Sequence, residues 1–170
     1  MENNFIALVV AALVPMVLGF IWYHPKLFGT AWMRSAGLTD EILKTGNMAV
    51  IFGVSFLMSI MLAFVMNVIG YHDSFVAGAM YYATNGTMIP EAGSELAKWF
   101  EYYQSNLAES NHTFKHGAFH GASIAGIFIV LPITVFNALF ERKGFKYMAI
   151  NAGFWIVSLS LMGGIIASWH

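Results

Sequence analysis

Cysteine is absent from the 170 residues, and its absence removes several kinds of chemistry. A chain without thiols has no disulfides, thiolate metal sites, cysteine nucleophiles or covalent c-type haem links. Cysteine usage therefore also gives no indication of the redox compartment.

Charge is scarce as well. Charged residues make up 10% of the chain, whereas an ordinary soluble domain carries about 25%. Hydrophobic residues make up 58%, and the mean hydropathy is +0.66. The net charge of -1 gives no reason to expect nucleic acid as a partner. This composition predicts a membrane protein surrounded by a lipid bilayer.

Several functional motifs are also missing from the sequence. It contains no glycine-rich phosphate loop, no convincing nucleophile–base arrangement and no paired carboxylates within an apolar segment. A membrane enzyme has little support, because one histidine-rich patch is its only candidate chemistry. Low-complexity tracts and soluble linkers are absent too, so we expect residues 1–170 to form a single transmembrane domain.

Four apolar segments are long enough to cross a bilayer. A spanning helix needs about 20 mostly apolar residues for a hydrocarbon core about 30 Å thick. The first segment has no basic residue ahead of it and no convincing small-residue cleavage site, so we interpret it as a retained helix. The sequence predicts an all-α integral membrane bundle of four transmembrane helices, at about 3–23, 48–69, 116–140 and 147–169.

The segment between the second and third helices, residues 70–115, is predicted to form a long outer loop. Its apolar stretch 75–89 has 15 residues, which is short for a span and suits a re-entrant or surface helix. Residues 94–107 carry apolar side chains at helical spacing, with charged ones between them. With Ser94 as N-cap, this pattern predicts a short amphipathic surface helix.

The basic residues are distributed unevenly between the two sides of the predicted bundle. The loops 24–46 and 141–146 hold six of the eight Lys and Arg residues. The opposite side has two basic residues and six acids, on the N-terminus and the 70–115 loop. Because basic loops stay in the cytoplasm, both termini are predicted to be external.

Three sequence motifs resemble one known family. They are GFIWYHPKLFGTAW, NALFERKGFKYMAINAGFW and SLSLMGGIIASW. They are similar to the bacterial integral-membrane family called domain of unknown function 1761, over roughly residues 5–69 and 113–169. The resemblance implies a small multi-pass protein of the bacterial inner membrane, and it supplies no catalytic residues. Residues 70–112 look longer than the outer loop expected for that family.

A run of histidines, HTFKHGAFHG, opens the third helix. Residues four apart drift only about 40° around a helix, so the three histidines share one face. An i, i+4 pair can hold one metal ion, but the outer two of the three stand about 12 Å apart along the axis. The alternative interpretation is an interfacial anchor. The hypothesis of a divalent-metal or proton site uses His116 and His120, with His112, Glu91 and Glu109 as further contributors.

Two functions of different classes remain open at this point. The first is a small inner-membrane protein that acts by self-association as a homo-oligomer, or by association with another membrane protein. The small residues of the third helix and the surface helix at 94–107 would supply its contacts. The alternative is a subunit for transport or permeation of protons or a divalent metal, entered from the acidic, histidine-rich outer side. The metal content of the purified protein would discriminate between them.

Overall fold

The computed structural model describes residues 4–169, and over this range the secondary structure is helical, without strands. Four helices or helical runs within it are long and apolar enough to cross a membrane. The predicted all-α bundle with four such helices is therefore confirmed. The four long apolar helices are Phe5–Trp22 (α1), Met48–Ile69 (α4), Phe114–Phe140 (α8, η2 and α9) and Phe145–Ser168 (α10). Glu2 and His170, which the sequence places on the external side, lie outside the described range.

Polar caps determine where three of these helices begin. Asn4 accepts hydrogen bonds from the backbone of α1, and Asn47 accepts one from the backbone of α4. The Thr113 hydroxyl accepts the His116 backbone N–H at 3.2 Å, so the third span begins at Phe114, two residues ahead of the predicted start. α10 begins at Phe145, after Gly144.

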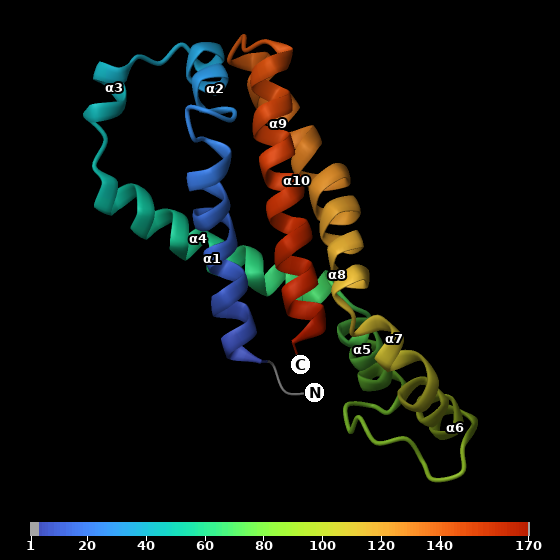
Figure 1. The fold of residues 1–170 in the computed structure, drawn as a ribbon. Helices are drawn as coiled ribbons and strands as arrows, with labels where there is room; N and C mark the ends of the chain where they lie inside the picture. The colour runs from blue at the N-terminus through green and yellow to red at the C-terminus, as the bar shows by residue number, and fades with distance from the viewer. Residues whose placement is uncertain (1–3, 170) are drawn as a thin grey trace.

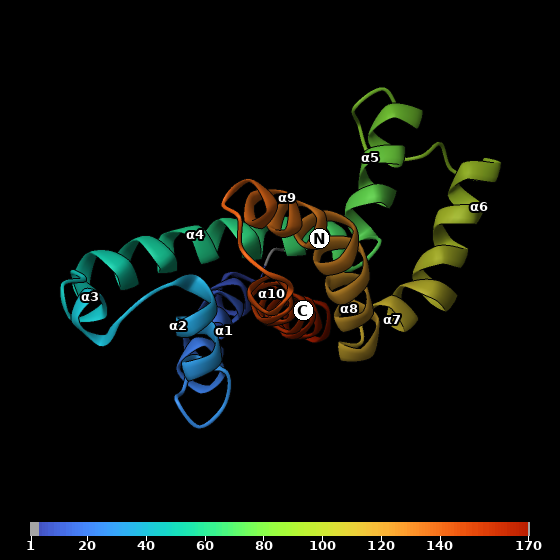
Figure 2. The same cartoon turned by 90° about the horizontal axis from the view of Figure 1, so that it is seen from above.

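Three of the spanning helices run side by side, and the fourth is steeply inclined. α1, α10 and the α8–α9 rod lie together, with α10 in the centre, whereas α4 crosses them at an angle (Figure 1). Seen from above, the first half of α4 extends away from the other helices (Figure 2). Gly29–Ala36 (α2) and Asp40–Lys44 (α3) lie at one end of the bundle, and the ends of the described chain lie at the other.

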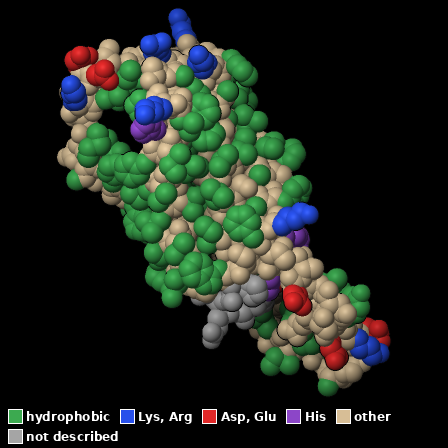
Figure 3. Space-filling view, in the orientation of Figure 1, with side chains coloured by type: hydrophobic (Ala, Val, Ile, Leu, Met, Phe, Trp, Pro, Cys, Tyr) green, Lys and Arg blue, Asp and Glu red, His purple; other side chains and the backbone are tan. Residues whose placement is uncertain are grey.

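The interior of the bundle is small and is built around α10. Half of the most apolar stretch of α10 is buried, compared with 11% for α4. Elsewhere, apolar side chains cover the middle of the surface, and most charges gather towards the two ends (Figure 3). This distribution suits helices surrounded by lipid tails. The main core cluster consists of Leu8, Ala11, Ala12, Ala63, Met66, Ala125, Leu159, Met162 and Ile166.

The third span packs against α10 through glycines. α8 (Phe114–His120) continues into the π-helical turns Gly121–Val130 (η2) and then Leu131–Phe140 (α9). A methyl group on Gly121 would overlap the Leu159 carbonyl, and one on Gly117 would overlap the Gly163 carbonyl. The two glycines therefore allow close contact between the third span and α10. This face, which the sequence offered as a contact for another protein, packs against α10 of the same chain.

The segment between α4 and the third span forms short helices rather than a fifth span. Asp73–Ala83 (α5) has 11 residues, about 16 Å at 1.5 Å per residue, which is too short to cross the bilayer. The predicted amphipathic helix is confirmed as Glu95–Tyr102 (α6), where Ser94 caps the N-terminus by accepting the Ala97 N–H at 3.1 Å. It continues as Tyr103–Leu107 (η1) and Ala108–Asn111 (α7).

Candidate metal centre

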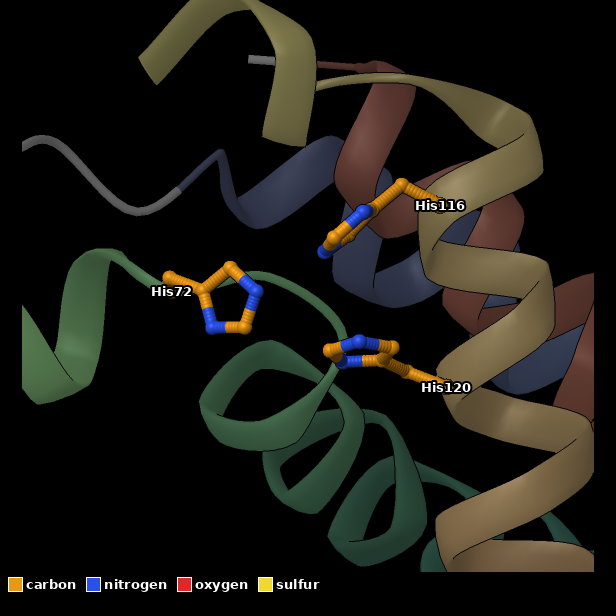
Figure 4. A group of neighbouring side chains, drawn as sticks. All are labelled: His72, His116 and His120. Carbon is orange, nitrogen blue, oxygen red and sulfur yellow. The ribbon is translucent and has the colours of Figure 1, made fainter. Parts of the chain in front are cut away.

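Three histidines from two separate parts of the chain meet beside the end of the bundle. His116 and His120 project from α8, and His72 faces them from the turn between α4 and α5 (Figure 4). One nitrogen from each ring can be chosen so that all three lie within 4.8 Å of one another. The ring centroids of His116 and His120 are 4.4 Å apart. The ring centroid of His72 lies 4.9 Å from that of His116 and 5.1 Å from that of His120. We call these three residues the histidine triad.

The third span presents its two histidines together because of its cap and its glycines. The Thr113 cap fixes the first turn of α8, so residues four apart stand one turn above each other. Gly117 and Gly121, which follow His116 and His120, lie about 100° further around the helix and face α10. The two imidazoles are therefore directed away from α10 and towards the α4–α5 turn.

A backbone carbonyl at the end of α4 orients one of the rings. His120 Nδ1 lies 2.8 Å from the Ile69 carbonyl oxygen. A carbonyl only accepts hydrogen bonds, so Nδ1 must carry the proton, and a neutral ring then has its lone pair on Nε2. Metal-binding histidines commonly use their second nitrogen in this way, which fixes both tautomer and direction.

The other two rings are available for the same chemistry. His116 Nε2 is buried and has no hydrogen-bond partner among the described residues. His72 is half-buried, and this burial, followed by the nearby His120, lowers its pKa, while Asp73 acts weakly in the opposite direction. A lowered pKa keeps the imidazole neutral at pH 7, which is the form that binds metal.

The donor set restricts which ions could bind. Three neutral imidazoles without thiolate or carboxylate suit Zn²⁺ and other divalent transition metals better than Ca²⁺ or Mg²⁺. Zn–N bonds of about 2.0–2.1 Å at tetrahedral angles place ligand nitrogens about 3.4 Å apart. The rings would therefore have to draw closer together on binding. Three protein ligands would leave a fourth position open to water or another ligand.

A second polar network adjoins the histidine triad. The Tyr103 hydroxyl donates a hydrogen bond to Asp73 Oδ1 at 2.8 Å, and His112 Nε2 lies 3.0 Å from Asp73 Oδ2. Burial, followed by the hydrogen bond to Asp73, raises the pKa of Tyr103 to about 12, so the phenol keeps its proton. The network connects η1 and α7 to the start of α5.

The structure places the predicted site residues in different surroundings. His116 and His120 come together, whereas His112 pairs with Asp73. The suggested acids Glu91 and Glu109 are exposed and do not belong to the group of possible ligands found among the described residues. The sequence assigned no site role to His72. Its only signal was that five of the six histidines, His72 included, fall on the predicted outer side.

A family model described as "Protein of unknown function (DUF1761)" matches residues 6–167, and the chain belongs to this family. The match runs through residues 70–112 as well as the parts that carry the sequence resemblance. No curated protein and no solved structure matches the chain.

Proposed function

We propose that this member of the DUF1761 family is a membrane protein that binds a divalent transition-metal ion through His72, His116 and His120. The convergence of the three rings carries the proposal. Two of them are on one helical face and the third lies more than forty residues earlier in the chain, so helical periodicity alone does not explain the meeting. The carbonyl at His120 and the unpartnered nitrogen of His116 support it.

The geometry favours capture of the ion over passage through the bundle. The described interior next to the histidine triad is closed by apolar side chains such as Met66, Leu159 and Met162, each no more than 1% exposed. Such a core offers a hydrated ion no ligands, and the cost of stripping its water would be high. We therefore favour metal capture at one membrane surface over the permeation role.

We place the histidine triad on the external side of a bacterial inner membrane. The support is the charge distribution, because six of the eight Lys and Arg residues belong to the loops at the opposite end. Self-association also stays a prediction, but the glycine face of the third span no longer supports it, because that face packs against α10.

The test is metal titration of the detergent-purified, chelator-stripped protein with Zn²⁺, and with Co²⁺ as a spectroscopic probe. Wild-type protein should bind one ion. His72→Ala should weaken binding by about tenfold or more, since even the loss of an outer-shell partner costs 10–100-fold. The double variant His116→Ala/His120→Ala should abolish binding.

Two matched controls accompany these variants. His24→Ala removes an imidazole at the opposite end of the bundle, and His112→Ala removes the one that pairs with Asp73. Both should keep the wild-type stoichiometry, and helix content by circular dichroism should be unchanged in every variant. Equal Zn²⁺ affinity of wild-type and His72→Ala proteins would refute the three-histidine site.

A further inference from the structure

At the basic end of the bundle, α4 leaves α1 and opens an apolar cleft. The cleft has a volume of about 930 Å³ and lies between α1, the first half of α4 and two aromatic residues of α10. Ligand sites typically enclose about 300–1,000 Å³, so this cleft is at the large end of that range. An opening is visible near this end of the space-filling view (Figure 3).

The depth of the cleft matches one leaflet of a bilayer. Its wall on α1 runs from Pro15 to Tyr23, and its wall on α4 runs from Val50 to Ser59. Because α4 is inclined, the wall on α1 gives the depth of the cleft, which at 1.5 Å per residue is about 12 Å. The hydrocarbon core is about 30 Å thick, so half of it is about 15 Å. An acyl chain from the adjacent leaflet therefore has the right length and polarity.

The mouth of the cleft is polar and cationic. His24 lines both the cleft and a smaller adjoining recess of about 400 Å³, which also contains Lys26. His24 Nδ1 accepts the Lys26 backbone N–H at 3.2 Å, so the neutral ring carries its proton on Nε2, where it can donate to a ligand. The mouth thus offers an ammonium group and an imidazole N–H to an anion.

The whole end of the molecule has the matching charge. The loops that flank the mouth contain six basic residues against three acids, Asp40, Glu41 and Glu141, so they carry a net positive charge. Basic clusters next to a membrane-spanning helix attract anionic headgroups. The acyl chains of any lipid could fill an apolar groove, so they give no selectivity. The positive charge at the mouth, in contrast, favours lipids with anionic headgroups.

We propose that the cleft holds an acyl chain of one anionic phospholipid, whose phosphate lies at Lys26 and His24. The ligand is a constituent of the leaflet on the basic side, and it reaches the cleft laterally between α1 and α4. This site is at the opposite end of the bundle from the histidine triad, so it stands or fails independently of metal binding.

Native mass spectrometry of the intact protein tests the proposal. The protein is taken from mixed micelles that contain equal amounts of phosphatidylglycerol and phosphatidylcholine. One phosphatidylglycerol should stay bound in clear preference to phosphatidylcholine. Lys26→Gln and His24→Gln should each reduce that preference several-fold, because they remove the headgroup contacts and leave the apolar walls intact.

Filling the cleft provides the second arm, with a matched control. Ser55 lines the cleft, and Ser55→Phe should reduce retention of both lipids. Gly53→Phe adds a ring to the same helix at a position that has no heavy atom within 4 Å of an added Cβ and does not line the cleft, so retention should be unchanged. Thermal unfolding of both variants checks that they fold.

Three outcomes would overturn the proposal. Equal retention of the two lipids would mean that only unselective boundary lipid is present. Equal behaviour of Ser55→Phe and Gly53→Phe would place any bound lipid elsewhere. A lipid-free dimer that Ser55→Phe dissociates would show that a second copy of the chain fills the cleft. If Ser55→Phe fails to fold, the headgroup variants still decide the result.

Discussion

The two ends of the bundle differ in how closely their helices approach. Beside the histidine triad, the third span and α10 are in backbone contact at Gly117 and Gly163. At the basic end, α4 stands away from α1 and leaves a cleft of about 930 Å³. The closed end brings three imidazole rings together, whereas the open end presents apolar walls beneath a cationic rim.

The difference shows how small residues determine where the helices of a membrane bundle pack closely. Lipid tails are as apolar as the helices, so close association depends on side-chain shape and on polar contacts. Glycine permits backbone contact where the third span meets α10. α4 has mainly large apolar side chains along its first half, and these are exposed. The metal hypothesis therefore belongs to the closely packed end, and the lipid hypothesis belongs to the open one.

The largest effect is expected from breaking the closed end. Gly121→Leu would drive a side chain into the Leu159 carbonyl, which cannot move without shifting α10. Overpacking against a backbone should cost about 3 kcal/mol, the upper part of the usual range. Thermal unfolding in detergent measures this cost.

The control for that variant is Gly53→Leu on α4, where an added Cβ meets no heavy atom within 4 Å. It should leave the unfolding temperature nearly unchanged. If the two leucine variants unfold alike, the glycines of the third span are not what closes this end.

The next effect is the pH dependence of metal binding. Neutral imidazole is the ligand, and burial lowers the pKa of His72 below the ordinary value of about 6.5. Zn²⁺ affinity should therefore change little between pH 8 and 7 and should fall only at a pH below about 6.5. Isothermal titration at several pH values measures the profile.

The same shift has a consequence for stability, with a defined sign. The metal-free folded protein takes up a proton at His72 less readily than the unfolded chain, whose histidines titrate near 6.5. Stability should therefore be lost as the pH falls through about 6.5 towards the lowered pKa. His72→Ala should show a smaller loss between pH 7.5 and 5.5. An equal loss in both proteins would assign the effect to other groups.

The smallest expected effect is the difference in stability lost when one tyrosine hydroxyl is removed from each end of the bundle. Tyr103 donates a hydrogen bond to the Asp73 carboxyl group at 2.8 Å, and Tyr23 donates one to the Asn151 side-chain oxygen at 3.1 Å. Hydrogen bonds to charged groups contribute about 1.5–3 kcal/mol, and neutral ones about 0.5–1.5 kcal/mol. Tyr103→Phe should thus destabilise the protein by about 1 kcal/mol more than Tyr23→Phe, as measured by thermal unfolding. The reverse order would show that the Asp73 network contributes little to stability.

Much of the local structure could be predicted from short-range pattern. Helix length and hydropathy identify the four long apolar helices, and Ser94 marks the start of α6 because a cap acts within one turn. The shared face of His116 and His120 also follows from the helical repeat. The third helix begins at 114 rather than at the predicted 116, because Thr113 caps the first turn ahead of the long apolar run.

Contacts between distant segments could not be predicted in this way. The sequence indicated contacts at the small residues of the third helix but left the partner open; for Gly121 the partner is Leu159 on α10. Likewise, Asp73 was only one of six acids assigned to the outer side. Its pairing with His112 and Tyr103 depends on how α5, η1 and α7 pack together.

The sequence alone determined that this protein is a set of long apolar helices with charges segregated to their ends, because these properties depend on residues within a few turns of one another. Only the tertiary structure decided that His72 meets His116 and His120, and that α4 stands away from α1. Those features depend on crossing angles, which are set by the summed packing of glycines and large side chains across helices far apart in the chain.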